Sequence, residues 1–225
     1  PHYFIEHFLL AEGGVKEHSN KDIAAVKETW VKALTMFKTF GDIGAFPIDT
    51  ATSKHELQQQ AFNDGKAAMF LDGSWAIGGM TDQDHTVIVP MPSTGNGKKD
   101  PSDIIAGFSS GYFITKKAWD DPAKRDAAVK FVENMTSTEL IKQFVVEAGG
   151  GAPAADIGPV EGLSKLAATG SQMAGEAKNC DAAVDAWLSK QAWDYLLGKV
   201  PVIEAGKEEP AAVVDKIIEM QNAAK

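Results

Sequence analysis

The residues best suited to bind a small molecule lie in the stretch 61–80, AFNDGKAAMFLDGSWAIGGM. Ala67 to Leu71 is a short apolar run bounded by turn residues, which is typical of a buried strand. Asp72-Gly73-Ser74 then ends the strand and offers a helix cap, so that Trp75 falls in the first turn of the next helix. We therefore expect a large aromatic ring at the carboxyl end of a strand, where open α/β sheets bind ligands. The alternative, that Trp75 is an ordinary core aromatic, stays open.

Composition excludes several classes of partner. The chain has 225 residues, of which 44% are hydrophobic and 24% charged, as in ordinary globular proteins of one or two domains. Its net charge of -9 argues against binding to nucleic acid, because that affinity depends on Lys and Arg neutralising phosphates. The same charge argues against an anionic membrane surface, and no apolar run is long enough to span a bilayer.

Metal and cofactor chemistry find no support in the sequence. The single cysteine, Cys180, rules out an internal disulfide, and the five histidines show no spacing typical of metal ligands. The glycine run 149–151 lacks the GK[ST] of a phosphate-binding loop. We therefore predict no metal site and no cofactor. The chain begins at Pro1, inside an apolar helical pattern, which we interpret as a processed or truncated product.

Periodicity and turn signals divide the chain into helices and a few strands. The apolar face of the second helix carries Trp30, which we expect in the core. Trp187 and Trp193 lie six positions apart on one predicted helix, so they point apart. The predicted helices span 3–11, 22–40, 53–62, 116–136, 137–147, 160–169, 181–197 and 208–224, and the predicted strands span 67–71, 86–91 and 104–115.

The motif at 62–75 resembles that of the extracellular (periplasmic) solute-binding proteins of sugar ABC transporters, family 1, which are maltose-binding-protein-like. The similar residues are the Phe and Asn at 62–63, Gly-Lys-Ala-Ala-Met at 65–69 and Gly-Ser-Trp at 73–75. The loop 149–154 also resembles the family's Gly-x-x-Pro-Ala loop. The resemblance covers nearly the whole chain and implies an α/β fold, periplasmic-binding-protein-like type II, with mostly helices around a mixed sheet.

The family's chains are longer, and this chain resembles their C-terminal half. The resemblance implies a discontinuous C-terminal lobe at 1–107 and 154–225, and a segment of the N-terminal lobe at 108–153. The chain would cross between the lobes near 104–111 and 149–155. Because most of the N-terminal lobe would be absent, we expect 108–153 to expose apolar surface and to contact the missing N-terminal half of the same protein or to self-associate.

The resemblance also implies which residues face the ligand. The Trp of the motif, Trp75, lines the sugar site in the family, and Trp193 and Tyr3 occupy positions of two further aromatics. Trp187 is expected to pack in the interior, and a terminal core position for Tyr3 stays open. Aromatic rings cover the apolar faces of a sugar, while polar groups bind its hydroxyls. The remaining candidates are Phe108 beside the crossing and the polar residues Asp72, Ser74, Ser109, Ser110 and Asp194.

The predicted function is that of a non-enzymatic, extracytoplasmic component of an ABC importer, periplasmic or lipid-anchored on the cell surface. Such proteins close two lobes around a ligand, here a carbohydrate, and deliver it to the permease subunits. Three alternatives stay open. A polyamine site would need several carboxylates around the Trp residues. A glycosidase would need a carboxylate pair, such as Asp72 and Asp194, at a fixed separation. A structural or adhesive role predicts no response to small ligands.

Overall fold

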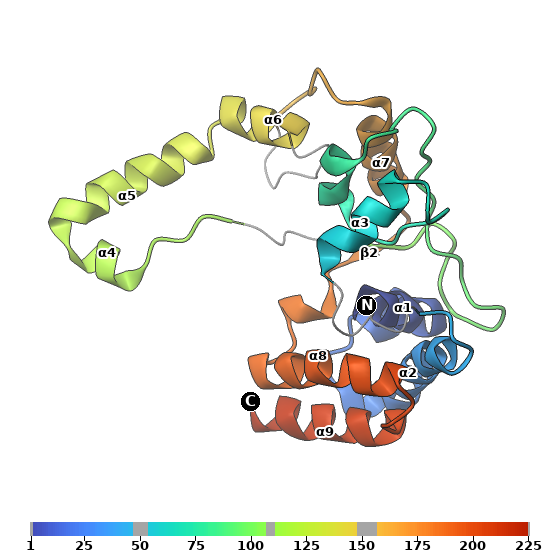
Figure 1. Ribbon diagram of the computed structural model, residues 1–225. Coiled ribbons are helices and arrows are strands. Elements are labelled where there is room, and N and C mark those ends of the chain that lie inside the picture. The colour runs from blue at the N-terminus through green and yellow to red at the C-terminus, as the bar shows by residue number, and fades with distance from the viewer. Residues whose placement is uncertain (1, 47–53, 107–110, 148–156, 225) are drawn as a thin grey trace. The chain divides into compact units, whose positions relative to one another are not determined.

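The computed structural model describes residues 2–46, 54–106, 111–147 and 157–224, which divide into two compact units. Unit 1 comprises Pro1–Leu71, Val89–Gly107 and Glu176–Lys225, and unit 2 comprises Asp72–Ile88 and Phe108–Gly175. The chain therefore leaves unit 1 and returns to it twice, and Figure 1 shows the order of the elements. The lobe boundaries proposed from the sequence stay a prediction.

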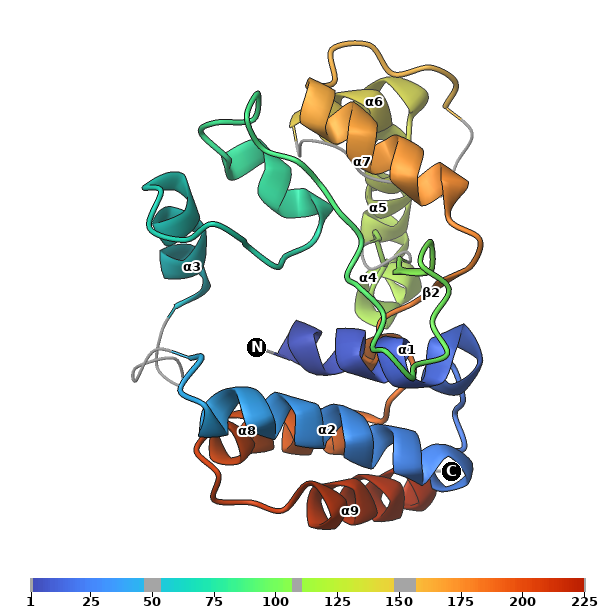
Figure 2. The same cartoon turned by 90° about the vertical axis from the view of Figure 1, so that its right-hand side faces the viewer.

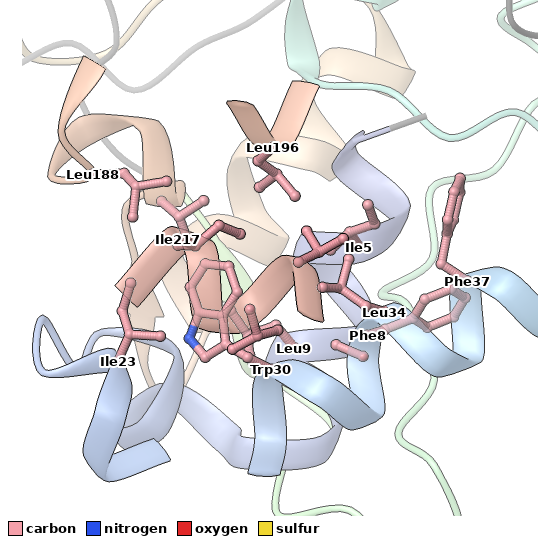
Figure 3. Packing of buried hydrophobic residues seen from close by; sticks show 14 of the residues in the cluster. Ile5, Phe8, Leu9, Ile23, Trp30, Leu34, Phe37, Leu188, Leu196 and Ile217 are labelled. Atoms are coloured by element: carbon pink, nitrogen blue, oxygen red, sulfur yellow. The ribbon is translucent and has the colours of Figure 1, made fainter. Parts of the chain in front are cut away.

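Four helices form the body of unit 1: α1 (His2–His18), α2 (Lys27–Asp42), α8 (Lys190–Glu204) and α9 (Pro210–Ala223). Helix α2 follows a short 3₁₀ turn, η1 (Ile23–Val26), and packs against the other three helices. Figure 2 shows α2 between α1 and α9. The apolar face predicted for this region is confirmed, because Trp30 is 1% exposed and Phe37 is fully buried. Figure 3 shows these side chains packed with residues from α1, α8 and α9.

Helix α1 consists of two helical segments joined at a kink. Gly14, with φ 62° and ψ 179°, interrupts the helical geometry close to the end predicted from the sequence, and a second segment follows to His18. The kink frees carbonyl groups of the preceding turn, and the loop at 97–99 pairs them. Lys98 N–H donates to the Glu12 carbonyl at 3.2 Å and Lys99 N–H to the Ala11 carbonyl at 3.4 Å. A tertiary contact therefore pairs carbonyl groups at the end of the first helical segment.

The strands were the least accurate prediction. The described residues contain one parallel pair, β1 (Ile104–Ile105) with β2 (Cys180–Asp181), in the register Ile104 to Cys180. The predicted strands 67–71 and 86–91 are wrong, since neither segment pairs with another. Met69 is 88% and Val87 79% exposed, so the apolar side chains that suggested buried strands have no covering layer. The predicted strand 104–115 is reduced to Ile104–Ile105, and 107–110 lie outside the described residues.

The remaining elements of unit 1 are α3 (His55–Asn63) and η3 (Val184–Ala186). The helix predicted at 181–197 begins later, because β2 and η3 occupy its first residues. Ser189 fixes the start of α8, since its hydroxyl oxygen accepts the Ala192 N–H at 3.3 Å.

Unit 2 contains η2 (Ser74–Gly79), α4 (Lys116–Asp120), α5 (Pro122–Met135), α6 (Thr138–Glu147) and all of α7 (Lys165–Glu176) except its last residue. The helix predicted at 116–136 is split at Asp121, because the residue before a proline is disfavoured in helical geometry. Asp121 caps α5 by accepting the Ala123 N–H at 3.0 Å. The helix predicted at 160–169 is shifted to α7, where the Ser164 hydroxyl accepts the Ala167 N–H at 3.2 Å. No helix in the described ranges has the length and apolarity needed to cross a membrane.

Candidate functional site

Trp75 lies on a short 3₁₀ turn rather than in a helix after a strand. The turn η2 begins at Ser74, with Ala76 N–H donating to the Gly73 carbonyl at 3.0 Å. Ala76 and Ile77 are buried, and Ile77 packs against Leu166 of α7. Trp75, on the same turn, is 52% exposed. Trp75 is therefore not a core residue of unit 2. The small core holds the turn through Ala76 and Ile77 and leaves the Trp75 ring partly open to solvent.

Gly73 allows the Trp75 ring to lie against the backbone. A Cβ atom at residue 73 would stand 2.3 to 2.6 Å from three carbons of the indole, a separation that no side chain tolerates. The Gly73 N–H donates to the Asp72 carboxylate at 2.8 Å, which fixes that side chain beside the turn. Ser74 is exposed. Asp72, Ser74 and Trp75, predicted to act together, are therefore neighbours on one turn of unit 2.

Tyr3 and Trp193 are joined in unit 1 by His2, which the sequence analysis did not single out. The His2 ring lies 4.1 Å from the Tyr3 ring, between centroids, and 5.3 Å from the Trp193 ring in an edge-on arrangement. The first turn of α1 and the first turns of α8 thus present three adjacent rings. Trp193 is only partly buried, although it also contacts the core of unit 1.

Trp187 packs edge-on against the buried Trp30, with 6.5 Å between ring centroids. Asp194 is exposed and forms an ion pair with Lys190, with 2.5 Å between Nζ and Oδ2. Phe108, Ser109 and Ser110 lie outside the described residues.

The two groups of candidates belong to different compact units. Asp72, Ser74 and Trp75 are in unit 2, whereas Tyr3, Trp193 and Asp194 are in unit 1. Neither unit by itself therefore brings Asp72 and Asp194 together as an acid–base pair. Among the residues that the structure describes, no three His, Cys, Asp or Glu side chains gather in a way that could hold a metal ion.

A buried acid–base cluster in unit 1 was not predicted. His18 is fully buried, and its Nδ1 lies 2.7 Å from Asp181 Oδ2. Its Nε2 lies 4.0 Å from Oε2 of Glu6, which is 2% exposed and accepts the Val184 N–H at 3.0 Å. The sequence could not place Glu6 and His18 together, because the predicted helix ended before residue 18. The available signal was an acidic residue inside the apolar run 3–11.

Burial controls the ionisation of this cluster. Burial raises the pKa of Glu6 from 4.5 to about 7, since a carboxylate loses hydration there, although the Val184 N–H acts in the opposite direction. Burial also lowers the pKa of His18 below its ordinary value of 6.5 despite the nearby Asp181 carboxylate. The neighbouring His7 has its pKa lowered from 6.5 to about 4, mainly by burial and also by His18 and Lys99.

Comparison with known proteins agrees with the family suggested by the motif. The chain belongs to the family of bacterial extracellular solute-binding proteins, whose model matches residues 2–157. One curated relative is a maltotriose-binding protein of Pyrococcus abyssi (strain GE5 / Orsay), 27% identical over 150 residues. That match covers 65% of this chain but 31% of the relative.

Two solved structures share the fold. A chitin oligosaccharide binding protein matches with a TM-score of 0.78 and 22% identity, over 98% of this chain and 56% of its own length. A protein described in work on xylan utilisation by the thermophilic bacterium Caldanaerobius polysaccharolyticus matches with a TM-score of 0.73 and 19% identity, over 97% of this chain and 57% of its own. The type II periplasmic-binding fold expected from the sequence is thereby confirmed, and the chain spans little more than half of these structures.

Proposed function

We propose that the complete protein is the extracytoplasmic substrate-binding component of an ABC importer, which captures a carbohydrate and delivers it to the permease. Family membership supports a binding protein rather than an enzyme. The names of the similar proteins mention maltotriose, chitin oligosaccharide and xylan, all of which are carbohydrates. Anchoring by a lipid and location in a periplasm are both compatible with this role.

The carbohydrate proposal depends mainly on one observation: Trp75 is half-exposed on a turn whose residues Ala76 and Ile77 are buried. An exposed indole covers the apolar C–H face of a sugar, while Asp72 and Ser74 on the same turn can bind hydroxyl groups. The rings of Tyr3, His2 and Trp193 in unit 1 offer a second aromatic surface. Phe108 and Ser109, expected from the sequence beside a crossing between the lobes, and Asp194, next to Trp193 in the sequence, complete the proposed set of ligand-facing residues.

The complete protein needs a partner surface for unit 2. Helix α5 has 14 residues and none of them is buried, and Phe131 on this helix is 56% exposed. Tyr112 packs edge-on against Phe131 at 5.9 Å between centroids, and Phe113 is 90% exposed. The matched structures contain a further part to which this chain has no counterpart, since the match covers 56% of one of them. We propose that this part, the N-terminal half of the fold, covers the apolar surface of α5, with self-association as its substitute when it is absent.

A thermal-shift screen tests the carbohydrate proposal. The chain is heated with malto-, chito- and xylo-oligosaccharides, with spermidine, and without ligand, because a ligand that binds only the folded state raises the melting temperature. We expect a rise with one class of oligosaccharide, lost in Trp75→Ala and kept in Trp119→Ala, a control tryptophan in unit 2 that is 51% exposed and covered by Arg125.

The other outcomes of the screen have defined meanings. A rise with spermidine alone would favour a polyamine-binding protein of the same fold. A rise that survives Trp75→Ala would remove the proposed role of this residue. The screen is repeated on a chain that also carries the N-terminal half of the fold, and the absence of any shift there would overturn the carbohydrate proposal.

A further inference from the structure

The cluster of Glu6, His18 and Asp181 plays no part in the proposed carbohydrate site, yet it joins segments that are distant in the sequence. Glu6 and His18 lie on the two sides of the kink in α1, and Asp181 belongs to β2. The backbone N–H of Val184 is held by Glu6 at 3.0 Å. These contacts attach the segment 180–184 to α1, soon after the chain has returned to unit 1 at Glu176.

Protons are required for this arrangement. With the Nδ1–H of His18 donated to Asp181, Nε2 carries a lone pair and faces the Glu6 carboxyl group at 4.0 Å. If neither Nε2 nor Glu6 held a proton, two acceptors would face each other, and the buried Glu6 carboxylate and the partly buried Asp181 carboxylate would have no cation between them. Glu6 Oε1 and His18 Nε2 are both buried without a hydrogen-bond partner, so these two atoms are the candidate positions for such a proton.

The charged groups around the pair come from four segments. Asp181 of β2 and Asp185 of η3 face Glu6 and disfavour its ionised form. The basic neighbours are His7 of α1 and Lys99 of the 97–99 loop, since both His18 and Lys99 lower the pKa of His7. The acidic groups favour keeping a proton on the pair, and the basic groups oppose adding a second one.

We propose that Glu6 and His18 together hold a single proton throughout the mildly acidic range. By doing so they keep the segment 180–184 attached to α1 at every pH within that range, and we call this pair a one-proton latch. When the segment opens to water, Glu6 becomes a carboxylate and His18 an imidazolium, and the pair still holds one proton. Since opening neither takes up nor releases a proton, linkage predicts that its equilibrium does not depend on pH.

A variant that keeps only Glu6 or only His18 should show a pH-dependent opening equilibrium, because the two opposite proton changes no longer cancel. With Glu6→Gln, opening lets His18 take up a proton, because the pKa of His18 is lowered in the closed state from 6.5. Opening should then become easier as pH falls below 6.5. With His18→Asn, whose amide N–H stands where Nδ1–H donates to Asp181, opening lets Glu6 lose a proton. Because the closed-state pKa of Glu6 is raised from 4.5 to about 7, opening should then become easier as pH rises above 4.5.

Amide hydrogen exchange of Val184 measures the opening directly, since Glu6 accepts its N–H. Rates are converted to protection factors, which removes the intrinsic pH dependence of exchange, and the Leu34 amide in the core of α2 is the internal reference. From pH 4.5 to 6.5 we expect constant protection in the wild-type chain. Protection should fall up to tenfold per pH unit toward acid in Glu6→Gln and toward neutral pH in His18→Asn, since each slope reports one proton.

Two controls keep the result decisive. Glu12→Gln makes the same charge change on α1 outside the cluster and should behave as wild type. If the single variants do not fold, the double variant Glu6→Gln/His18→Asn is compared with the wild-type chain, and the Val184 protection factor should not change with pH in either. The imidazole nitrogens of His18 in the wild-type chain should also report a neutral ring at pH 6. A wild-type slope or flat single variants would each overturn the latch. So would a second proton on the pair, seen as an imidazolium at His18 together with a protonated Glu6 carboxyl group at pH 6.

Discussion

At the scale of single residues, exposure separates the tryptophans of this chain more clearly than sequence position does. Trp30 is 1% exposed and fills the core, whereas Trp75 is 52% exposed on a turn whose other side is buried. A ring that the fold holds in place but does not cover loses little conformational freedom when a ligand covers it. This difference gives Trp75 its place in the proposed site.

The first prediction concerns His7, whose ring is partly buried and has its pKa lowered to about 4. The unfolded chain binds a proton at this residue below 6.5, while the folded chain resists it until about pH 4. The contribution of His7 to stability is therefore complete above pH 6.5 and is lost as pH falls toward 4.

Replacing His7 by Gln removes this dependence. We expect the difference in unfolding free energy between the wild-type chain and His7→Gln to change by about 2 kcal/mol between pH 7 and pH 4.5, measured by urea denaturation at each pH. His85→Gln is the matched control, because His85 is exposed and its pKa is raised by Asp82, so it cannot produce a slope of this sign. A constant difference for His7→Gln would contradict the prediction.

At the scale of elements, the kink in α1 shows how a loop can pack where two helical segments join at a glycine. Gly14 adopts φ 62° and ψ 179°, a conformation accessible almost only to glycine. A Cβ atom there would also stand 2.9 Å from the Lys98 carbonyl oxygen. The kink and the loop at 97–99 therefore depend on each other, and the kink brings His18 to Asp181.

The second prediction follows from this geometry. Gly14→Ala should lower the unfolding free energy by about 1 to 3 kcal/mol, because it adds backbone strain and a clash with Lys98. Gly198→Ala, in the open interior of α8 with no heavy atom within 4 Å of its Cβ, should instead raise it by about 0.5 to 1 kcal/mol. Chemical denaturation of both variants measures the two effects, and equal effects would show that the kink is not specific to glycine.

At the scale of the whole molecule, the two units differ in how well they cover their apolar residues. Unit 1 has a core in which Leu34, Phe37 and Ile217 are fully buried. Unit 2 has a small core around Ile77, Leu166 and Ala167, and α4 and α5 bury no residue. A helix stabilises a fold mainly through the face that it buries, so α5 gains little from the unit that contains it.

The third prediction tests the exposed surface of α5. The chain by itself should bind an apolar dye such as ANS and associate with itself as its concentration rises, as measured by sedimentation. Phe131→Ser should weaken both effects several-fold, whereas Ile43→Ser, at a residue of unit 1 that is 71% exposed, should leave them nearly unchanged. A monomeric chain with no dye binding would show that unit 2 needs no partner.

Local patterns determined much of this protein. The apolar spacing of α2, the extent of α9 and the motif at 62–75 are all properties of short segments, so they could be found without a structure. The motif also identified the family and hence the fold. Local patterns could not show whether an apolar run has a neighbouring strand. For this reason 67–71 was predicted as a buried strand, although Met69 is 88% exposed.

The tertiary structure alone decided which distant residues meet. Only packing brings His2 between Tyr3 and Trp193, bends α1 at Gly14, and buries Glu6 with His18 and Asp181. These contacts join residues far apart in the sequence: His2 and Trp193 are separated by 191 positions (193 − 2), and His18 and Asp181 by 163. Helical periodicity carries no information at such distances, because it reports only which face of one element is apolar.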